Sequence, residues 1–235
     1  MTHMIKKINL GSGPVGKDDW INVDWGMLSF LHKFSLIEGL LLKLNLFPKG
    51  HNVKWPKNLI LHDCRKKLPF ADSTFDYVYT SHFLEHFKKF EAERIIKDCY
   101  NLLCKGGVMR IAVPDLEVLA QKYLAKDTEY FRRADKLMSG CGGEPGKPQD
   151  FLLADTFMDI FYPSFYKKEP AGIQRFFVSF VRPHCWMYDY ESLRHLLKNG
   201  GFVNIQRKSF GEGRVPDLAS LDVFPELSLY VEAEK

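Results

Sequence analysis

Residues 8–16 read Ile8-Asn9-Leu10-Gly11-Ser12-Gly13-Pro14-Val15-Gly16, and this stretch decides how the rest of the chain is interpreted. Three glycines follow directly after Ile5, Ile8 and Leu10, which we predict to be the end of a short buried strand. Glycines at such a point let the backbone turn sharply and approach a ligand closely, because no Cβ stands in the way. The stretch therefore predicts a nucleotide-type site after the first strand.

The composition limits the classes of protein to consider. A chain of 235 residues with 46% hydrophobic and 26% charged residues is typical of a soluble globular domain. The formal charge of +4 is spread along the chain without a long Lys/Arg run, so we predict no nucleic-acid partner. Five cysteines without a C-x-x-C pair, and no apolar leader at the N-terminus, predict reduced thiols and a cytoplasmic location.

The most apolar segment, residues 27–47, contains His32, Lys33, Glu38 and Lys43. A spanning helix needs about 20 residues with few or no charges, so we predict no stable insertion into a membrane. Docking of this segment on a membrane or on a lipid-linked substrate stays open.

Short apolar runs separated by helical periodicity are typical of an α/β fold with a mainly parallel sheet. After the glycine turn we expect strands at residues 20–24, 58–63, 75–80, 108–113, 202–206 and 227–231. We expect one or two helices in residues 27–46, one at 91–103 capped by Lys105-Gly106-Gly107, and one that starts at the cap Asp189 and stops at Asn199-Gly200-Gly201.

Residues 125–182 interrupt this alternation, and we interpret them as an insertion after the fifth strand. They hold a glycine-rich loop at 139–146 and a cluster of aromatic residues. The insertion would serve as extra core, as a cap over a substrate, or as both. The aromatic cluster includes Phe151, Phe157, Phe161, Tyr162, Phe165 and Tyr166.

The glycine turn partly matches two phosphate-binding motifs, but the residues that follow it do not provide the helix that either motif requires. In a P-loop the position after Lys17 should be Ser or Thr at a helix start, and here it is Asp18. A dinucleotide fingerprint matches Gly11, Gly13 and Gly16, but it needs a full helix and then an acid about 20 residues on. Asp24 comes too early for that spacing.

A third interpretation takes four segments together. They are residues 8–13, 21–24 (Ile-Asn-Val-Asp), 68–76 (Leu-Pro-Phe-Ala-Asp-Ser-Thr-Phe-Asp) and 81–86 (Ser-His-Phe-Leu-Glu-His). In order and spacing they resemble the class I S-adenosylmethionine-dependent methyltransferases of the methyltransferase-11-like type, which act on small molecules or glycans. Residues 94–115, with Leu103 followed by Gly106-Gly107, are similar to the same family. The resemblance covers about residues 5–117 and resumes at about 187–232.

The resemblance implies a Rossmann-like α/β fold. Its seven-stranded mixed sheet would have the order 3-2-1-4-5-7-6, with the last strand antiparallel and helices on both faces. Residues 1–235 would form a single methyltransferase domain, with 125–182 as a cap inserted after strand 5. The chain departs from the family between the first two strands, where it leaves room for about one helical turn instead of a full helix.

The resemblance also implies S-adenosylmethionine as the cofactor, bound at the carboxyl ends of the first strands. Gly11 and Gly13, with Ser12 between them, would let the backbone approach the methionine moiety. Asp24 would accept hydrogen bonds from the ribose hydroxyls.

Four further positions complete the implied cofactor site. Asp63 would lie near the adenine amine, with Cys64 beside it. Ser81 and His82 would flank the methionine end and the methyl group. For Asp24 and Asp63 the alternative is a helix cap or a turn acid.

An oxygen or nitrogen acceptor can need a base within hydrogen-bond reach, and His86, Asp115 and His184 are the candidates, with His82 beside them. Asp115 can instead cap a helix that begins near Leu116. Residues 82–86 also match the zinc-peptidase pattern H-x-x-E-H, but no third ligand stands out downstream, so we predict no metal site.

The sequence thus predicts a methyltransferase that transfers a methyl group to oxygen or nitrogen of a small-molecule or glycan-type acceptor. Two alternatives remain: a protein that binds S-adenosylmethionine without turnover, and an NAD-dependent oxidoreductase. The sequence leaves the acceptor atom and the oligomeric state open.

Overall fold

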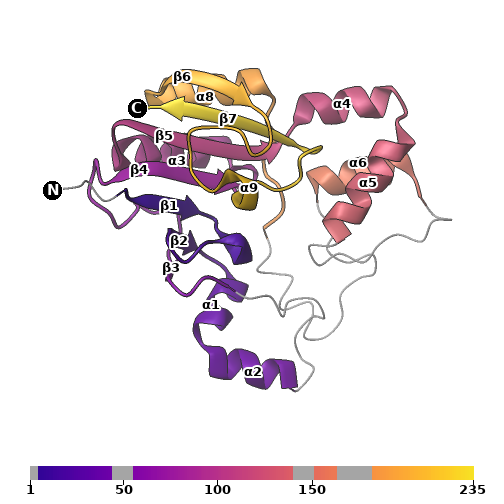
Figure 1. The fold of residues 1–235 in the computed structure, drawn as a ribbon. Coiled ribbons are helices and arrows are strands. Elements are labelled where there is room, and N and C mark those ends of the chain that lie inside the picture. Colours follow the sequence, from indigo (N-terminus) through magenta and orange to yellow (C-terminus); the bar gives the residue numbers. More distant parts are fainter. Residues whose placement is uncertain (1–4, 44–54, 140–150, 163–181) are drawn as a thin grey trace. The chain divides into compact units, whose positions relative to one another are not determined.

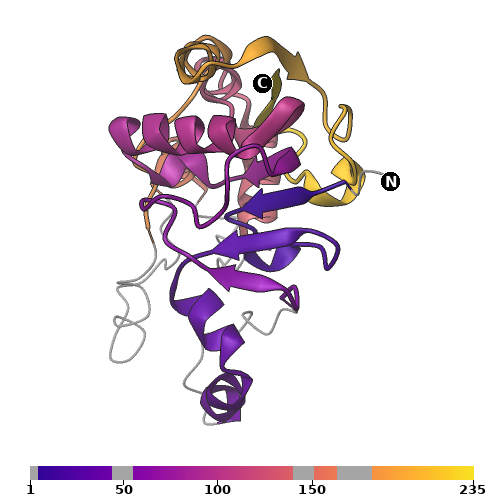
Figure 2. The same cartoon turned by 90° about the vertical axis from the view of Figure 1, so that its left-hand side faces the viewer.

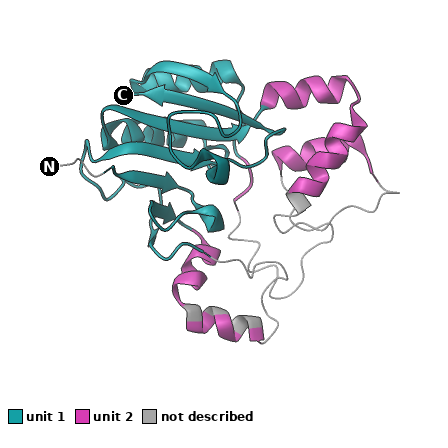
Figure 3. Ribbon diagram, in the orientation of Figure 1, with its two compact units in different colours: residues 1–25, 55–115, 185–235 teal, residues 26–54, 116–184 magenta. Residues whose placement is uncertain are grey.

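The computed structural model describes residues 5–43, 55–139, 151–162 and 182–235, and Figure 1 shows its fold. The chain divides into two compact units, coloured separately in Figure 3. The first unit holds residues 1–25, 55–115 and 185–235, and the second holds residues 26–54 and 116–184. The single domain over 1–235 with a cap at 125–182 stays a prediction. Residues 140–150 and 163–181 of that cap lie outside the described residues.

The first unit is built around a seven-stranded sheet with the order β3-β2-β1-β4-β5-β7-β6. Strands β1 to β5 are parallel, and β7 is antiparallel to both β5 and β6. The predicted Rossmann-like α/β class and strand order are therefore confirmed. The strands are β1 (Lys7–Leu10), β2 (Ile21–Asp24), β3 (Leu59–Leu61), β4 (Phe75–Ser81), β5 (Leu103–Pro114), β6 (Val203–Lys208) and β7 (Ser228–Glu234).

The first strand is buried as expected, except at its start. Ile8 and Leu10 are fully buried because β1 lies inside the sheet, between β2 and β4. The prediction that Ile5 belongs to the same buried strand is wrong, since its side chain is 58% exposed. Ile5 precedes Lys7, the first residue of β1, so neighbouring strands do not cover it.

Helices α3 (Lys89–Leu102) and α8 (Tyr190–Gly200) pack together on one face of this sheet (Figure 2). The predicted cap of α8 is confirmed, because the Asp189 carboxylate accepts the Ser192 N–H at 2.8 Å. The helix ends at Gly201, whose φ of 104° is left-handed. The buried face of α3 is formed by Ala92, Ile95, Ile96, Cys99 and Leu102.

The other side of the sheet carries a smaller apolar cluster. It includes Trp20 and Tyr79 from the sheet side and Leu218 and Leu221 from the short helix α9 (Leu218–Leu221). The segment after β6 therefore returns over the sheet before it enters β7.

The predicted cap of α3 at Lys105-Gly106-Gly107 is wrong. The helix ends at Leu102, and the chain passes directly into β5 at Leu103. Gly106 (φ 78°) and Gly107 lie within β5 and exchange backbone hydrogen bonds with Lys235. The register between β4 and β5 shifts at this point, and glycine permits the left-handed backbone that the irregularity requires.

The second unit contains five described helices. In this unit, Phe157 stacks on Tyr123 with ring centroids 4.5 Å apart and contacts Phe161 at 4.8 Å, so two members of the predicted aromatic cluster pack against each other. Phe165 and Tyr166 lie outside the described residues. Within the described ranges, no helix has both the length and the apolar character needed to cross a membrane. The helices are α1 (Met27–Lys33), α2 (Ser35–Lys43), α4 (Leu116–Leu124), α5 (Thr128–Ser139) and α6 (Leu153–Phe161).

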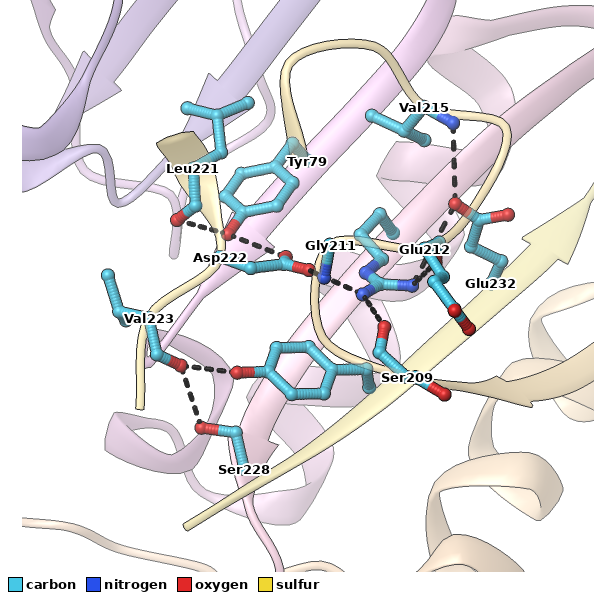
Figure 4. Close-up of polar contacts among 12 residues, drawn as sticks. Tyr79, Ser209, Gly211, Glu212, Val215, Leu221, Asp222, Val223, Ser228 and Glu232 are labelled. Atoms are coloured by element: carbon cyan, nitrogen blue, oxygen red, sulfur yellow. Dashed lines mark hydrogen bonds and ion pairs between the residues drawn. The ribbon is translucent and has the colours of Figure 1, made fainter. Parts of the chain in front are cut away.

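A buried charge fixes the segment between β6 and β7 to the middle of the sheet (Figure 4). Arg110, in β5, is fully buried, and its Nη2 lies 2.5 Å from the Asp222 carboxylate. The same guanidinium donates to the carbonyls of Ser209 and Glu212 at 2.9 Å each. The Asp222 carboxylate also accepts the Gly211 N–H at 2.9 Å. Because each charge is paired and hydrogen-bonded, the cost of burying it is offset.

Asp222→Asn should destabilise the protein by about 3 kcal/mol, because it removes the nearer charge partner of the buried Arg110 guanidinium and leaves only Glu232, at 3.9 Å. Urea denaturation of the protein measures this loss. Glu191→Gln is the matched control, since Glu191 pairs with Arg194 on the exposed surface of α8 and should leave the midpoint unchanged. A loss below about 1 kcal/mol for Asp222→Asn would contradict the role assigned to the buried pair.

Candidate cofactor site

The turn after β1 begins with a glycine that no other residue can replace without rearrangement. Gly11 has a φ of 68°, and a Cβ placed on it would lie 2.2 Å from Cδ2 of Phe83. Its N–H donates to the carbonyl of Val23 at 2.8 Å, which ties the turn to β2. Gly11 is therefore required both by its backbone conformation and by the close approach of Phe83.

Gly13 lies at the open side of the same turn. Its φ is 50°, and a Cβ built on it would meet no atom within 4 Å. Its N–H donates to Oδ2 of Asp24 at 2.7 Å. Between the two glycines, Ser12 is 5% exposed and its N–H lies 3.2 Å from the Val23 carbonyl. The structure thus places Gly11, Ser12, Gly13 and Asp24 together at the carboxyl ends of β1 and β2.

Asp24 is the most strongly constrained acid of this group. Burial raises the pKa of its carboxyl group, while hydrogen bonds from the Gly13 and Trp25 backbone and the nearby His86 act in the opposite direction. His86, one of the predicted bases, therefore lies near Asp24. A half-buried carboxylate with a raised pKa at the carboxyl edge of a sheet is a frequent feature of functional sites.

Gly16 has a different role from the one that a nucleotide fingerprint would give it. A Cβ at this position would lie 2.2 Å from Oδ1 of Asn22, so the backbone approaches a strand side chain. Residues Gly13–Val15 form only a short 3-10 turn, η1. Lys17, the residue that a P-loop would direct at a phosphate, donates to Ser220 at 3.0 Å. The helix that both phosphate motifs require is absent between β1 and β2.

Asp63 and Cys64 follow β3, as expected. The surroundings of the two side chains differ from each other. The Arg65 guanidinium binds the Asp63 carboxylate in a bidentate pair, with N–O distances of 2.6 and 2.8 Å. Cys64 is 3% exposed, and burial raises the pKa of its thiol to about 12. The thiol is therefore protonated at neutral pH and contributes apolar surface.

Ser81 and His82 lie at the carboxyl end of β4, beside β5. The His82 N–H donates to the carbonyl of Ala112 at 2.9 Å. The φ of His82 is 47°, a left-handed conformation that costs a non-glycine residue about 1–2 kcal/mol. Strain of this kind persists only where the surrounding structure imposes it, and it gathers at functional sites.

The motif H-x-x-E-H does not form the face that zinc binding requires. Only Leu84–His86 is helical, as the single 3-10 turn η2, and His82 precedes it. The two histidines therefore do not lie one turn apart on an α-helix.

The other two predicted bases, Asp115 and His184, each have a polar partner of their own. Asp115 is 2% exposed, and Arg207 donates to its carboxylate at 2.5 Å. His184, in the second unit, has its Nδ1 2.7 Å from the carbonyl of Ile160. Within the first unit, the structure brings His86 rather than Asp115 to the carboxylate at the end of β2.

Sequence reasoning missed Phe83, Glu85 and Arg207. The glycines at 11 and 13 predicted that the backbone approaches another group closely. The sequence did not show that this group is the side chain of Phe83. Glu85 stood inside a recognised motif, yet its complete burial was not expected of a charged residue.

The geometry fits S-adenosylmethionine. The open side of Gly13 leaves room for a ligand against the backbone, and Asp24, beside it, offers a carboxylate suited to a ribose diol. Both lie at the carboxyl ends of parallel strands, where ligands of open α/β sheets bind.

The family comparison agrees with this fit. Residues 44–111 match the model of a methyltransferase domain. The matched segment and the strand order are together consistent with a class I S-adenosylmethionine-dependent methyltransferase, an enzyme whose cofactor is S-adenosylmethionine.

No curated protein matches this sequence. Several solved structures are similar to it at low identity. One, from Methanosarcina mazei, is described as an S-adenosylmethionine-dependent methyltransferase, with 16% identity, coverage of 100% of this chain and 94% of that chain, and a TM-score of 0.48. Another, from Thermotoga maritima, is described as a possible histamine N-methyltransferase, with 15% identity, coverage of 98% and 82%, and a TM-score of 0.46. A methyltransferase from Archaeoglobus fulgidus has 15% identity, coverage of 99% and 87%, and a TM-score of 0.45.

Asp24→Asn should bind S-adenosylhomocysteine about tenfold more weakly and yet be more stable than the wild type at neutral pH. The pKa of Asp24 is raised from 3.8, so above that value the folded chain holds the proton more tightly than the unfolded chain. Stability therefore falls as the pH rises through the folded pKa, and asparagine removes this loss while it still accepts the Gly13 N–H.

Calorimetric titration and thermal denaturation measure these two effects. Asp72→Asn is the control, because Asp72 is an exposed acid in a loop. It should change neither the affinity for S-adenosylhomocysteine nor the stability. A variant that binds as tightly as the wild type, or that is less stable at neutral pH, would contradict the role of Asp24.

Proposed function

We propose that this methyltransferase transfers a methyl group to a hydroxyl or amino group of a small-molecule or glycan-type acceptor. The observation that carries the proposed cofactor site is the Gly13 N–H bonded to Asp24 beside an open backbone surface. When bound, S-adenosylmethionine supplies a methyl group on a positively charged sulfur. The proposed cofactor-binding residues are Gly11, Ser12, Gly13, Asp24, Asp63, Cys64, Ser81 and His82.

The roles of these residues follow from their surroundings. Asp24 would accept hydrogen bonds from the ribose, and the open side of Gly13 would receive the methionine portion. Asp63 would meet the adenine amine through carboxylate oxygens that it shares with Arg65. The protonated thiol of Cys64 would line the adenine with apolar surface.

Among the predicted bases we propose His86 for proton removal from the acceptor. It lies near Asp24 at the edge where the cofactor site is placed. Asp115 is the weaker candidate, because its carboxylate is paired with Arg207 and would have to leave this partner to accept a proton. His184 remains a candidate from the second unit, with its Nδ1 beside the Ile160 carbonyl.

The proposed acceptor class rests on charge and composition. A net charge of +4 without a long Lys/Arg run favours a compact acceptor over a nucleic-acid backbone. The aromatic side chains of the second unit, such as Phe157 and Tyr123, support the proposal that residues 125–182 form a cap for a compact acceptor. We propose a cytoplasmic location from the cysteine usage.

Radiolabelled S-adenosylmethionine, offered with separate panels of small-molecule alcohols, amines and sugar intermediates and with RNA, tests this function. We expect label in a compact acceptor and none in RNA. With that acceptor, His86→Gln should lower kcat about 100-fold, the range typical of a general base, and leave the affinity for S-adenosylhomocysteine within about threefold.

Label that enters only RNA or protein would contradict the acceptor class. An unchanged kcat in His86→Gln would remove His86 as the base. His195→Gln, on the surface of α8, is the matched control and should behave as the wild type.

A further inference from the structure

His82 is held in its left-handed conformation by contacts with its ring from two directions. On one side its Nε2 lies 2.8 Å from Oγ of Ser228, the first residue of β7. Its ring also meets the edge of Phe224, with centroids 4.9 Å apart and planes at 85°. The ring is therefore oriented by groups that lie more than 140 residues away in the sequence.

The hydrogen bond to Ser228 determines which ring nitrogen carries a proton. The Ser228 hydroxyl donates to the carbonyl of Val223 at 3.2 Å, and a carbonyl can only accept. With its one hydrogen used in this way, the hydroxyl accepts from His82, which assigns a proton to Nε2.

The other ring nitrogen faces a carboxylate. Nδ1 of His82 lies 3.3 Å from Oε1 of Glu85, whose side chain is completely buried. With Nε2 protonated, a bare Nδ1 would turn its lone pair toward a carboxylate oxygen, which is repulsive. One further proton between the two atoms removes this conflict, and it also compensates the burial of the Glu85 charge.

The main chain of Glu85 is fixed as firmly as its side chain. Its carbonyl accepts the N–H groups of Cys185 and Trp186, at 2.7 and 3.1 Å. These bonds attach η2 to the segment that leads into α8. Glu85 is thus a rigid support from which to orient His82.

A neighbouring carboxylate lacks these contacts. Burial raises the pKa of the Tyr188 phenol, and both Glu85 and Glu93 raise it further, so both carboxylates lie near Tyr188. Glu93 is exposed on α3. Of the two acids, Glu85 is the one that pairs with His82.

We propose that Glu85 is a positioning residue for the methionine end of the cofactor site. Its buried carboxylate shares one proton with Nδ1 of His82 and so fixes the left-handed backbone of His82. The next residue, Phe83, is then held against Gly11, on the other side of the site. This inference rests on the proposed cofactor site.

Glu85→Gln tests the proposal, because glutamine keeps the shape of the side chain but cannot share the proton. We expect S-adenosylhomocysteine to bind about tenfold more weakly by calorimetry. Glu93→Gln is the matched control and should bind within about twofold of the wild type. Wild-type affinity in Glu85→Gln would overturn the proposal.

A double-mutant cycle shows whether Glu85 acts through His82. Asparagine tolerates a left-handed backbone, so His82→Asn removes the ring with little strain. In this background Glu85→Gln should change the affinity by less than about twofold. A tenfold loss in both backgrounds would show that Glu85 acts independently of His82 and would overturn the proposal.

Two further results keep the proposal separate from the proposed function. If the wild-type protein fails to bind S-adenosylhomocysteine, the cofactor site itself is overturned, whatever Glu85 does. If Glu85→Gln does not fold, ¹⁵N nuclear magnetic resonance of labelled histidine in the wild type decides the matter. A protonated Nε2 with a proton also shared at Nδ1 supports the proposal, and an unprotonated Nε2 or an Nδ1 without a shared proton overturns it.

Discussion

The contact between Gly11 and Phe83 is the constraint on which the carboxyl edge of the sheet depends. It brings the turn after β1 and the segment after β4 closer together than any residue with a side chain at position 11 would permit. The turn can then donate to Val23 in β2 and place Gly13 beside Asp24. Backbone geometry therefore determines the shape of the carboxyl edge of the sheet. A few polar side chains add the hydrogen-bonding groups that a ligand would contact.

Three charged residues of the first unit, Arg110, Glu85 and Asp24, have different surroundings. Arg110 is surrounded by a carboxylate and two carbonyls, which makes its pair with Asp222 purely structural. Oε1 of Glu85 lies 3.3 Å from Nδ1 of His82 at the edge of the sheet, in the pair for which we propose a shared proton. Asp24 keeps a raised pKa despite its backbone hydrogen bonds. Asp24 lies at the carboxyl edge of the sheet with a raised pKa, so its carboxylate would gain from hydrogen bonds donated by a ligand.

The sequence predicted much of the fold, and local rules account for the successes. The cap at Asp189 and the left-handed Gly201 were readable, because both depend on residues within one turn of the helix end. The same rule for helix ends predicted a cap of α3 at Gly106 and Gly107, and that prediction is wrong. The role of these glycines depends on pairing with Lys235 and on the register of β4 against β5. Such long-range pairing is not encoded by local spacing.

The site shows the same division. Gly11, Gly13 and Asp24 were predicted from their order along the chain, and the structure brings them together. The contact of the His82 ring with Ser228 could not be predicted, because it joins the segment after β4 to the start of β7. Arg110 did leave a signal that was overlooked: a charged residue within the apolar run 108–113 of a central strand implies a buried partner.

A crystal structure of the protein with S-adenosylhomocysteine tests the central claim most directly. We expect both ribose hydroxyls within hydrogen-bond distance of the Asp24 carboxylate, at about 2.7 Å, and the amino-acid portion along the open side of Gly13. A ligand whose ribose lies away from Asp24, or that leaves the glycine turn uncovered, would contradict the account.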